Sequence, residues 1–91
     1  MNWTNLTEKT VAITGGACGI GLAVAKGFAE VGANVLLADF AEEQGAGAID
    51  EISSLGGGEA MFVRCNVTSK ADVENMVATA VERFGRLDVL V

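Results

Sequence analysis

The chain has 91 residues, 51% of them hydrophobic, and a formal net charge of −6. This length fits one domain or part of one, and the negative charge argues against nucleic acid or an anionic membrane surface as a general partner. No apolar run approaches the roughly 18 residues that span a bilayer, so no membrane partner is expected. The opening segment 1–5 has neither the basic region nor the apolar core of a signal peptide. We therefore expect a cytoplasmic protein.

The chain has two cysteines, Cys18 and Cys65, and neither His nor Tyr. The cysteines are not in a CxxC or other metal-type spacing, and no His is present to complete a site, so we expect reduced thiols and no metal. Without Tyr or His, the chain has no phenolate and no imidazole to act as a general base. We therefore expect no catalytic residue among these 91 residues.

Four short apolar segments alternate with three segments of helical periodicity. The predicted strands are Thr10–Thr14, Asn34–Ala38, Ala60–Cys65 and Leu87–Val91. In the first predicted helix, Ile20, Val24, Phe28 and Val31 repeat at helical spacing, and Gly32 stops the helix. A second contains Ile49, Ile52 and Leu55, and a third begins at the capping-box pattern Ser69-x2-Asp72 and ends at Gly85. Such alternation implies a parallel sheet, and right-handed crossovers give the strand order 3-2-1-4. The first two helices then cover one face of the sheet and the third covers the other.

A glycine-rich turn, Thr-Gly-Gly-Ala-Cys-Gly-Ile-Gly, joins the first predicted strand to the first helix. Its Gly-x3-Gly-x-Gly spacing is formed by Gly15, Gly19 and Gly21. Strand, glycine turn and helix together present backbone amides and a helix N-terminus to a pyrophosphate. Glycine also allows phosphate oxygens to come close to the backbone. An ordinary flexible loop can have the same composition. The residues that surround the turn therefore decide between a phosphate-binding turn and a flexible loop.

Asp39 supplies that context, because it stands at the end of the second predicted strand, 18 residues after Gly21. This is close to the offset at which an acidic side chain meets the adenosine ribose. A carboxylate there accepts from both ribose hydroxyls and repels the additional phosphate of NADP, and no Arg or Lys lies in the turn or beside Asp39 in the sequence. The alternative is that Asp39 only caps the following helix. Together with the glycine turn, Asp39 predicts NAD as the cofactor.

These features together resemble the short-chain dehydrogenase/reductase family. The resemblance covers the whole chain and rests on the glycine turn, Asp39, the segment Cys65-Asn66-Val67-Thr68 and the closing Gly85-Arg86-Leu87-Asp88-Val89-Leu90-Val91. It implies an α/β Rossmann-like parallel sheet with the order 3-2-1-4, a truncated half of a doubly wound fold. The implied cofactor-binding residues are Gly15, Cys18, Gly19, Ile20, Gly21, Asp39, Phe40, Asn66 and Val67.

The chain departs from the family pattern at two of these positions. The segment matching Asn66-Val67 normally reads Asp-Val and holds the adenine ring. An amide oxygen at Asn66 can still accept a hydrogen bond from the adenine amino group, but the charged acceptor is lost. The position matching Cys18 is usually a Ser whose hydroxyl supports the glycine turn, and a thiol is a poorer donor.

The family continues past the last predicted strand with an Asn-Asn-Ala-Gly turn, a catalytic Ser and a Tyr-x3-Lys motif, none of which occurs in this chain. The sequence stops at Val91, inside that hydrophobic strand. We therefore interpret residues 1–91 as a partial NAD-binding domain, the N-terminal half of a longer enzyme, and expect this chain alone to be inactive.

The resemblance implies that the parent enzyme moves a hydride between NAD and a carbonyl or secondary alcohol. Its expected partners are the dinucleotide, a small-molecule substrate and further copies of itself in a homo-oligomer. The opening Asn2-Trp3-Thr4-Asn5-Leu6 is similar to polyol and sugar-alcohol members of the family. The alternative function is a non-catalytic module that binds a nucleotide or a partner protein.

Overall fold

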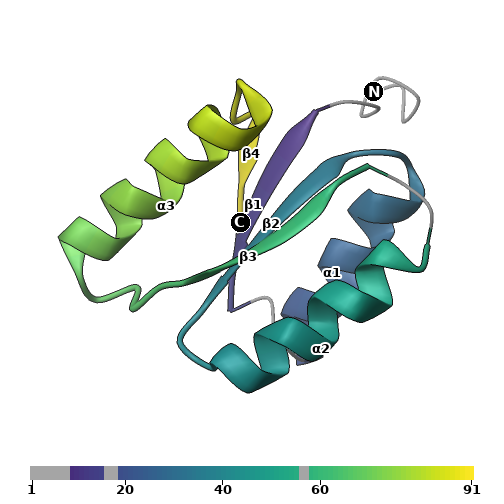
Figure 1. Cartoon of the computed structure of the whole chain (residues 1–91), viewed down its shortest axis with the longest axis horizontal. Helices are drawn as coiled ribbons and strands as arrows, with labels where there is room; N and C mark the ends of the chain where they lie inside the picture. Colours follow the sequence, from purple (N-terminus) through teal and green to yellow (C-terminus); the bar gives the residue numbers. More distant parts are fainter. Residues whose placement is uncertain (1–8, 16–18, 56–57) are drawn as a thin grey trace.

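Strands and helices alternate along the chain, as the periodicity predicts (Figure 1). The structure is a computed structural model, and it describes residues 9–15, 19–55 and 58–91. The strands are β1 (Thr10–Thr14), β2 (Asn34–Asp39), β3 (Ala60–Arg64) and β4 (Val89–Leu90). The helices are α1 (Gly19–Glu30), α2 (Glu42–Ser53) and α3 (Lys70–Phe84).

The four strands form one sheet in the order β3-β2-β1-β4, and every pairing is parallel. The predicted order is therefore confirmed. Strand β2 runs one residue further than predicted and strand β3 one residue less far, so that Asp39 and Arg64 are the last register partners of the two strands. This pairing brings the end of β3 directly beside the end of β2.

Strand β4 is shorter than predicted, because only Val89–Leu90 of Leu87–Val91 pair as a strand. Asp88 explains the late start. Its carboxylate accepts a hydrogen bond of 2.9 Å from the Thr10 N–H, and its own N–H donates to the Thr10 carbonyl at 2.9 Å. A side chain thus takes the backbone donor that a longer strand would have matched with a carbonyl.

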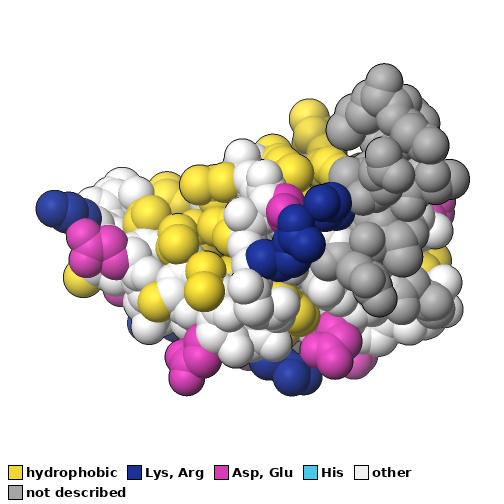
Figure 2. Space-filling model, turned by 90° about the horizontal axis from the view of Figure 1, so that it is seen from above, with side chains coloured by type: hydrophobic (Ala, Val, Ile, Leu, Met, Phe, Trp, Pro, Cys, Tyr) yellow, Lys and Arg dark blue, Asp and Glu magenta, His cyan; other side chains and the backbone are white. Residues whose placement is uncertain are grey.

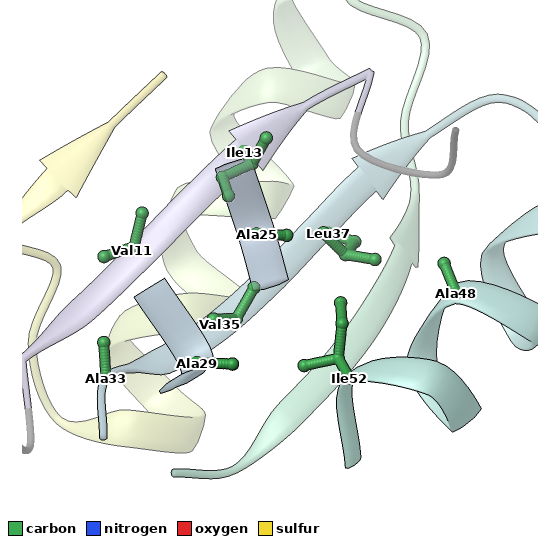
Figure 3. Packing of buried hydrophobic residues seen from close by; sticks show 9 residues of the cluster. All are labelled: Val11, Ile13, Ala25, Ala29, Ala33, Val35, Leu37, Ala48 and Ile52. Carbon is green, nitrogen blue, oxygen red and sulfur yellow. The ribbon is translucent and has the colours of Figure 1, made fainter. Parts of the chain in front are cut away.

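Helices α1 and α2 cover one face of the sheet, and α3 covers the other (Figure 1). Strand residues alternate between these layers: Val35 and Leu37 pack toward α1 and α2, whereas Leu36 and Ala38 pack toward α3. Figure 3 shows the buried cluster on the α1 and α2 side, which consists of Val11, Ile13, Ala25, Ala29, Ala33, Val35, Leu37, Ala48 and Ile52. The second cluster consists of Ala12, Leu36, Ala38, Cys65, Met76 and Ala80.

The hydrophobic residues at helical spacing in α1 do not all pack on the sheet. Val24 and Phe28 pack against the first cluster as expected, but Ile20 is 85% exposed. With 3.6 residues per turn, Ile20 lies about 140° around the helix from the buried Ala25. Ile20 therefore lies outside the face of α1 that packs on the sheet.

On the α3 side, some hydrophobic side chains remain in contact with solvent. Figure 2, which views the molecule from the top of Figure 1, shows hydrophobic side chains gathered on the side where α3 lies. Val81 of α3 is 47% exposed, and Leu90, which pairs with Ala12 of the second cluster, is 53% exposed. A single helix thus covers this face less completely than two helices cover the other.

Candidate functional site

A pocket of about 300 Å³ lies where the first three strands end. We call it the strand-end pocket, and its lining residues are Thr14, Gly15, Ala38, Asp39, Phe40, Cys65, Asn66 and Val67. Ligands of open α/β sheets bind in a crevice outside the carboxyl ends of the strands. The position of this pocket is therefore the one expected of a ligand site.

The strand-end pocket brings together five of the residues that sequence reasoning selected: Gly15, Asp39, Phe40, Asn66 and Val67. Three others, Gly19, Ile20 and Gly21, lie in the first turn of α1 and do not line this pocket. Cys18 lies outside the described residues.

Three lining residues, Thr14, Ala38 and Cys65, are not among the cofactor-binding residues that the family resemblance implies. Their common signal is that each stands at or next to the carboxyl end of a strand. The Thr14 hydroxyl donates at 2.9 Å to the Val91 carbonyl, so this side chain ties β1 to the chain that follows β4.

Gly15 and Gly19, the described glycines on either side of residues 16–18, have the backbone conformation for which glycine is suited. Gly15 and Gly19 have φ angles of +66° and +62°, a region that other residues rarely adopt. Gly15 is anchored by its N–H, which donates at 2.7 Å to the Ala38 carbonyl on β2. Among the described residues, and apart from chain neighbours and the backbone of α1 itself, no atom lies within 4 Å of the point where a Cβ would stand at either glycine. The backbone here is open to the close approach of a ligand.

Asp39 is half-buried at the end of β2, and its Oδ1 accepts a hydrogen bond of 3.1 Å from the Ala41 N–H. This bond shapes the turn into α2, whose N-cap is Ala41 and has no side-chain cap of its own. Asp39 thus has a structural role in the turn before α2, but it is not the cap of the helix, which was the alternative role. A carboxylate has about four acceptor sites, so this bond is compatible with hydrogen bonds to a ligand in the strand-end pocket.

Asn66 is positioned by the start of α3. The Ser69 hydroxyl accepts from the Asp72 N–H at 3.3 Å, which is half of the predicted capping box. The Asp72 carboxylate does not bond back to Ser69 and accepts instead from the Asn66 N–H at 2.9 Å. The cap of the helix thus holds the loop that carries Asn66 to the pocket.

The side-chain oxygen of Asn66 already has partners within its own loop. It accepts from the Thr68 N–H at 3.0 Å and from the Thr68 hydroxyl at 2.7 Å. An amide oxygen has two lone pairs, so the expectation that this oxygen accepts from adenine does not hold in this arrangement. The amide NH2 group, a donor, is the part of Asn66 that a ligand would meet.

Cys65 is 1% exposed at the base of the pocket. Burial and, to a smaller extent, the Asp72 carboxylate raise the pKa of the Cys65 thiol above its ordinary value of 9.0. The thiol is therefore protonated at neutral pH and is a poor nucleophile.

Arg64 adds a positive charge beside Asp39 that the order of residues in the chain does not reveal. Its Cζ lies 4.5 Å from the centroid of the Phe40 ring, and its Nε lies 4.0 Å from a carboxylate oxygen of Glu42. From the sequence around Asp39 we expected no Arg or Lys nearby. That expectation is wrong in the folded chain, because the pairing of β2 with β3 places Arg64 beside Asp39.

No helix in the described part of the chain has both the length and the apolar character needed to cross a membrane. Within residues 9–15, 19–55 and 58–91, no three side chains of His, Cys, Asp or Glu type are grouped so that they could hold a metal ion.

A parallel sheet with a glycine turn and an acidic residue at its strand ends is the arrangement found in dinucleotide-binding α/β proteins. The model of the short chain dehydrogenase family matches residues 9–91. The chain therefore belongs to the short-chain dehydrogenase/reductase family, whose members are oxidoreductases that use nicotinamide dinucleotides.

Individual relatives agree with this assignment. The chain is 48% identical over 85 residues to 2,5-dichloro-2,5-cyclohexadiene-1,4-diol dehydrogenase LinX of Sphingobium indicum, an alignment that covers 93% of this chain and 34% of that protein. The solved structure of a hydroxysteroid dehydrogenase from Escherichia coli superimposes with a TM-score of 0.91 at 35% identity, over 98% of this chain and 38% of the other. The structure of a xylitol dehydrogenase solved with bound NAD+ superimposes with a TM-score of 0.89 at 34% identity. This match covers 93% of the present chain and 32% of the xylitol dehydrogenase chain. The chain thus spans about a third of the length of the relatives that it matches.

Proposed function

We propose that this chain forms the adenosine and pyrophosphate half of an NAD(H) site in an oxidoreductase. The observation that carries the proposal is the strand-end pocket, which places Asp39, Phe40, Asn66 and Val67 together beside the glycine turn. In the proposed enzyme, NAD supplies the hydride acceptor for the oxidation of a secondary alcohol, and the reverse reaction reduces a carbonyl.

Each part of the pocket has a chemical role in this proposal. The open backbone at Gly15 and Gly19 leaves room for phosphate oxygens, and the N-terminus of α1 favours their negative charge. Asp39 accepts hydrogen bonds from the ribose hydroxyls. Phe40 and Val67, which are 60% and 58% exposed, offer apolar surface to the adenine.

The remaining selected residues have supporting roles. Asn66 donates from its amide group to a ring nitrogen of adenine, since Thr68 occupies its oxygen. Gly21 and Ile20 belong to the helix turn next to the phosphates, and Cys18 belongs to the glycine turn itself.

We further propose that NAD is preferred to NADP. The reason is the charge of Asp39, which repels a phosphate on the ribose 2′ oxygen. A secondary alcohol of the polyol type is the proposed substrate class, in keeping with the name of the xylitol dehydrogenase among the similar structures. The cytoplasmic location and the homo-oligomeric state of the parent enzyme stay predictions.

The proposal is tested by isothermal titration calorimetry, in which ADP is added to the purified chain and the dissociation constant is measured. ADP carries the adenine, the ribose and the pyrophosphate that the pocket is proposed to hold. We expect binding that Asp39→Ala weakens about tenfold, because a hydrogen bond to a charged group contributes about 1.5–3 kcal/mol. Glu43→Ala, which removes an equal charge from the exposed first turn of α2, should leave the affinity unchanged.

A second ligand isolates the contact with the ribose. We expect 2′-deoxy-ADP to bind the unmodified chain more weakly than ADP, and this difference should disappear in Asp39→Ala. Failure of the unmodified chain to bind ADP, or an equal effect of Asp39→Ala and Glu43→Ala, would overturn the proposal.

A further inference from the structure

We propose that Arg64 is a second determinant of cofactor choice, which attracts the 2′-phosphate that Asp39 repels. The inference rests on the proposed nucleotide site and concerns a residue on a different strand from Asp39. It implies that the preference for NAD over NADP is smaller than Asp39 alone would produce.

The pairing of β2 with β3 places the two charges side by side. Asp39 and Arg64 are register partners at the ends of neighbouring parallel strands, and such strands lie about 4.8 Å apart. Both side chains stand on the α1 and α2 side of the sheet, because Leu37 and Phe62, two residues earlier on each strand, pack into the cluster on that side. A group that lies against Asp39 therefore lies close to Arg64 as well.

The Arg64 guanidinium is held at the rim of the strand-end pocket by Phe40. Its Cζ is 4.5 Å from the ring centroid, and the ring itself lines the pocket. A guanidinium over an aromatic face stays close to the adenosine end of the site, whereas an unsupported arginine would extend into solvent.

The other contact of Arg64 leaves the group able to turn toward a ligand. The ion pair with Glu42 is long, with Nε and the carboxylate oxygen 4.0 Å apart, and the two side chains are 54% and 69% exposed. Exposed ion pairs of this kind contribute little. The planar fork of an arginine is well suited to bind two oxygens of a phosphate group, so a 2′-phosphate would compete well with Glu42.

The charges that face this point from the neighbouring elements are Asp39 on β2, Glu42 on α2 and Arg64 on β3. Two carboxylates against one guanidinium give a net negative site, which is consistent with a preference for NAD. When the Asp39 carboxylate is removed, the charges of Arg64 and Glu42 cancel, and the site no longer repels an anion.

Two nucleotides that differ only in the 2′-phosphate provide the test: 5′-AMP and adenosine 2′,5′-bisphosphate. The measured quantity is the ratio of their dissociation constants for the unmodified chain, Asp39→Ala, Arg64→Met and the double variant. We expect Arg64→Met to raise the preference for 5′-AMP about three- to tenfold, the range for one charge near a phosphate in a solvated site. Asp39→Ala should lower the preference for 5′-AMP. In the double variant, Arg64→Met should raise this preference again, to near that of the unmodified chain.

Two further variants separate charge from structure. Arg64→Lys keeps the positive charge without the planar fork and should fall between the unmodified chain and Arg64→Met. Arg83→Met is the matched control, because Arg83 is 56% exposed, is paired with Glu59 and lies near Asn34 at the other end of the sheet. This control should leave the ratio unchanged.

The possible outcomes are distinguishable. Equal weakening of both nucleotides by Arg64→Met would mean that Arg64 only supports Phe40, and an unchanged ratio would mean that it has no role; either result overturns the inference while the nucleotide site stands. Failure of the unmodified chain to bind either nucleotide would overturn the proposed function and this inference with it.

Discussion

Two glycines of α2, Gly45 and Gly47, should respond to alanine in opposite directions. Gly45 is buried, and a Cβ built on it would overlap the ring of Phe62 on β3, with the ring Cζ 2.6 Å away. Gly47 is exposed, and within the described part of the chain no atom outside its own helix lies within 4 Å of its Cβ position. Carbon atoms pack at about 3.5–4.0 Å, so alanine at Gly45 requires the ring to move by about 1 Å.

The difference between the two variants measures this overlap. Alanine is favoured over glycine in a helix interior by about 1 kcal/mol, and both variants gain this contribution. Overpacking of a core costs about 1–3 kcal/mol, and only Gly45→Ala carries that cost. We therefore expect Gly47→Ala to stabilise the chain and Gly45→Ala to lie about 1–3 kcal/mol below it in free energy of unfolding.

Urea unfolding followed by circular dichroism is the assay. With an m value of about 1 kcal/mol/M for a small protein, the two midpoints should differ by about 1 M or more. Phe62→Leu should reduce the penalty, so that the cost of Gly45→Ala is smaller in that background. An unfolding midpoint of Gly45→Ala at or above that of Gly47→Ala would refute the packing of α2 on β3 described above.

Three further predictions concern the site. Asn66→Asp exchanges the hydrogen bond that the amide donates to a ring nitrogen of adenine for one that a carboxylate accepts from the adenine amino group. Because a hydrogen bond to a charged group contributes more than one between neutral groups, this variant should strengthen ADP binding about fivefold in calorimetry, and unchanged or weaker binding would contradict the expectation. The free energy of unfolding should fall as pH rises above about 9, because the Cys65 thiol ionises at a lower pH in the unfolded chain, where its pKa is not raised by burial. In Cys65→Ala the free energy of unfolding should depend less on pH in this range. An equal slope in both proteins would contradict the role of Cys65. The 91-residue chain should show no NAD reduction with xylitol or other secondary alcohols in a spectrophotometric assay, because it has neither Tyr nor His; turnover that Gly19→Val abolishes would contradict the expectation.

The sequence by itself determined the elements and their order. Alternating apolar segments and helical periodicities depend on neighbouring residues, so β1 was predicted with its observed bounds and the end of α3 at Gly85 was recognised. The handedness of βαβ crossovers then left one reasonable strand order, which the sheet has. The strand-end positions of Asp39 and Asn66 follow from that order, because the carboxyl ends of parallel strands meet at one edge of a sheet.

Only the tertiary structure decided which side chains meet at that edge. Arg64 becomes a neighbour of Asp39 through the register of β2 with β3, although 25 residues separate them in the chain. The overlap that excludes a Cβ at Gly45 depends in the same way on how α2 packs over Phe62. The occupied oxygen of Asn66 depends on how the Thr68 loop closes onto the cap of α3. Such contacts arise from packing between segments, and the local pattern of residue types contains no information on the partner that packing will supply.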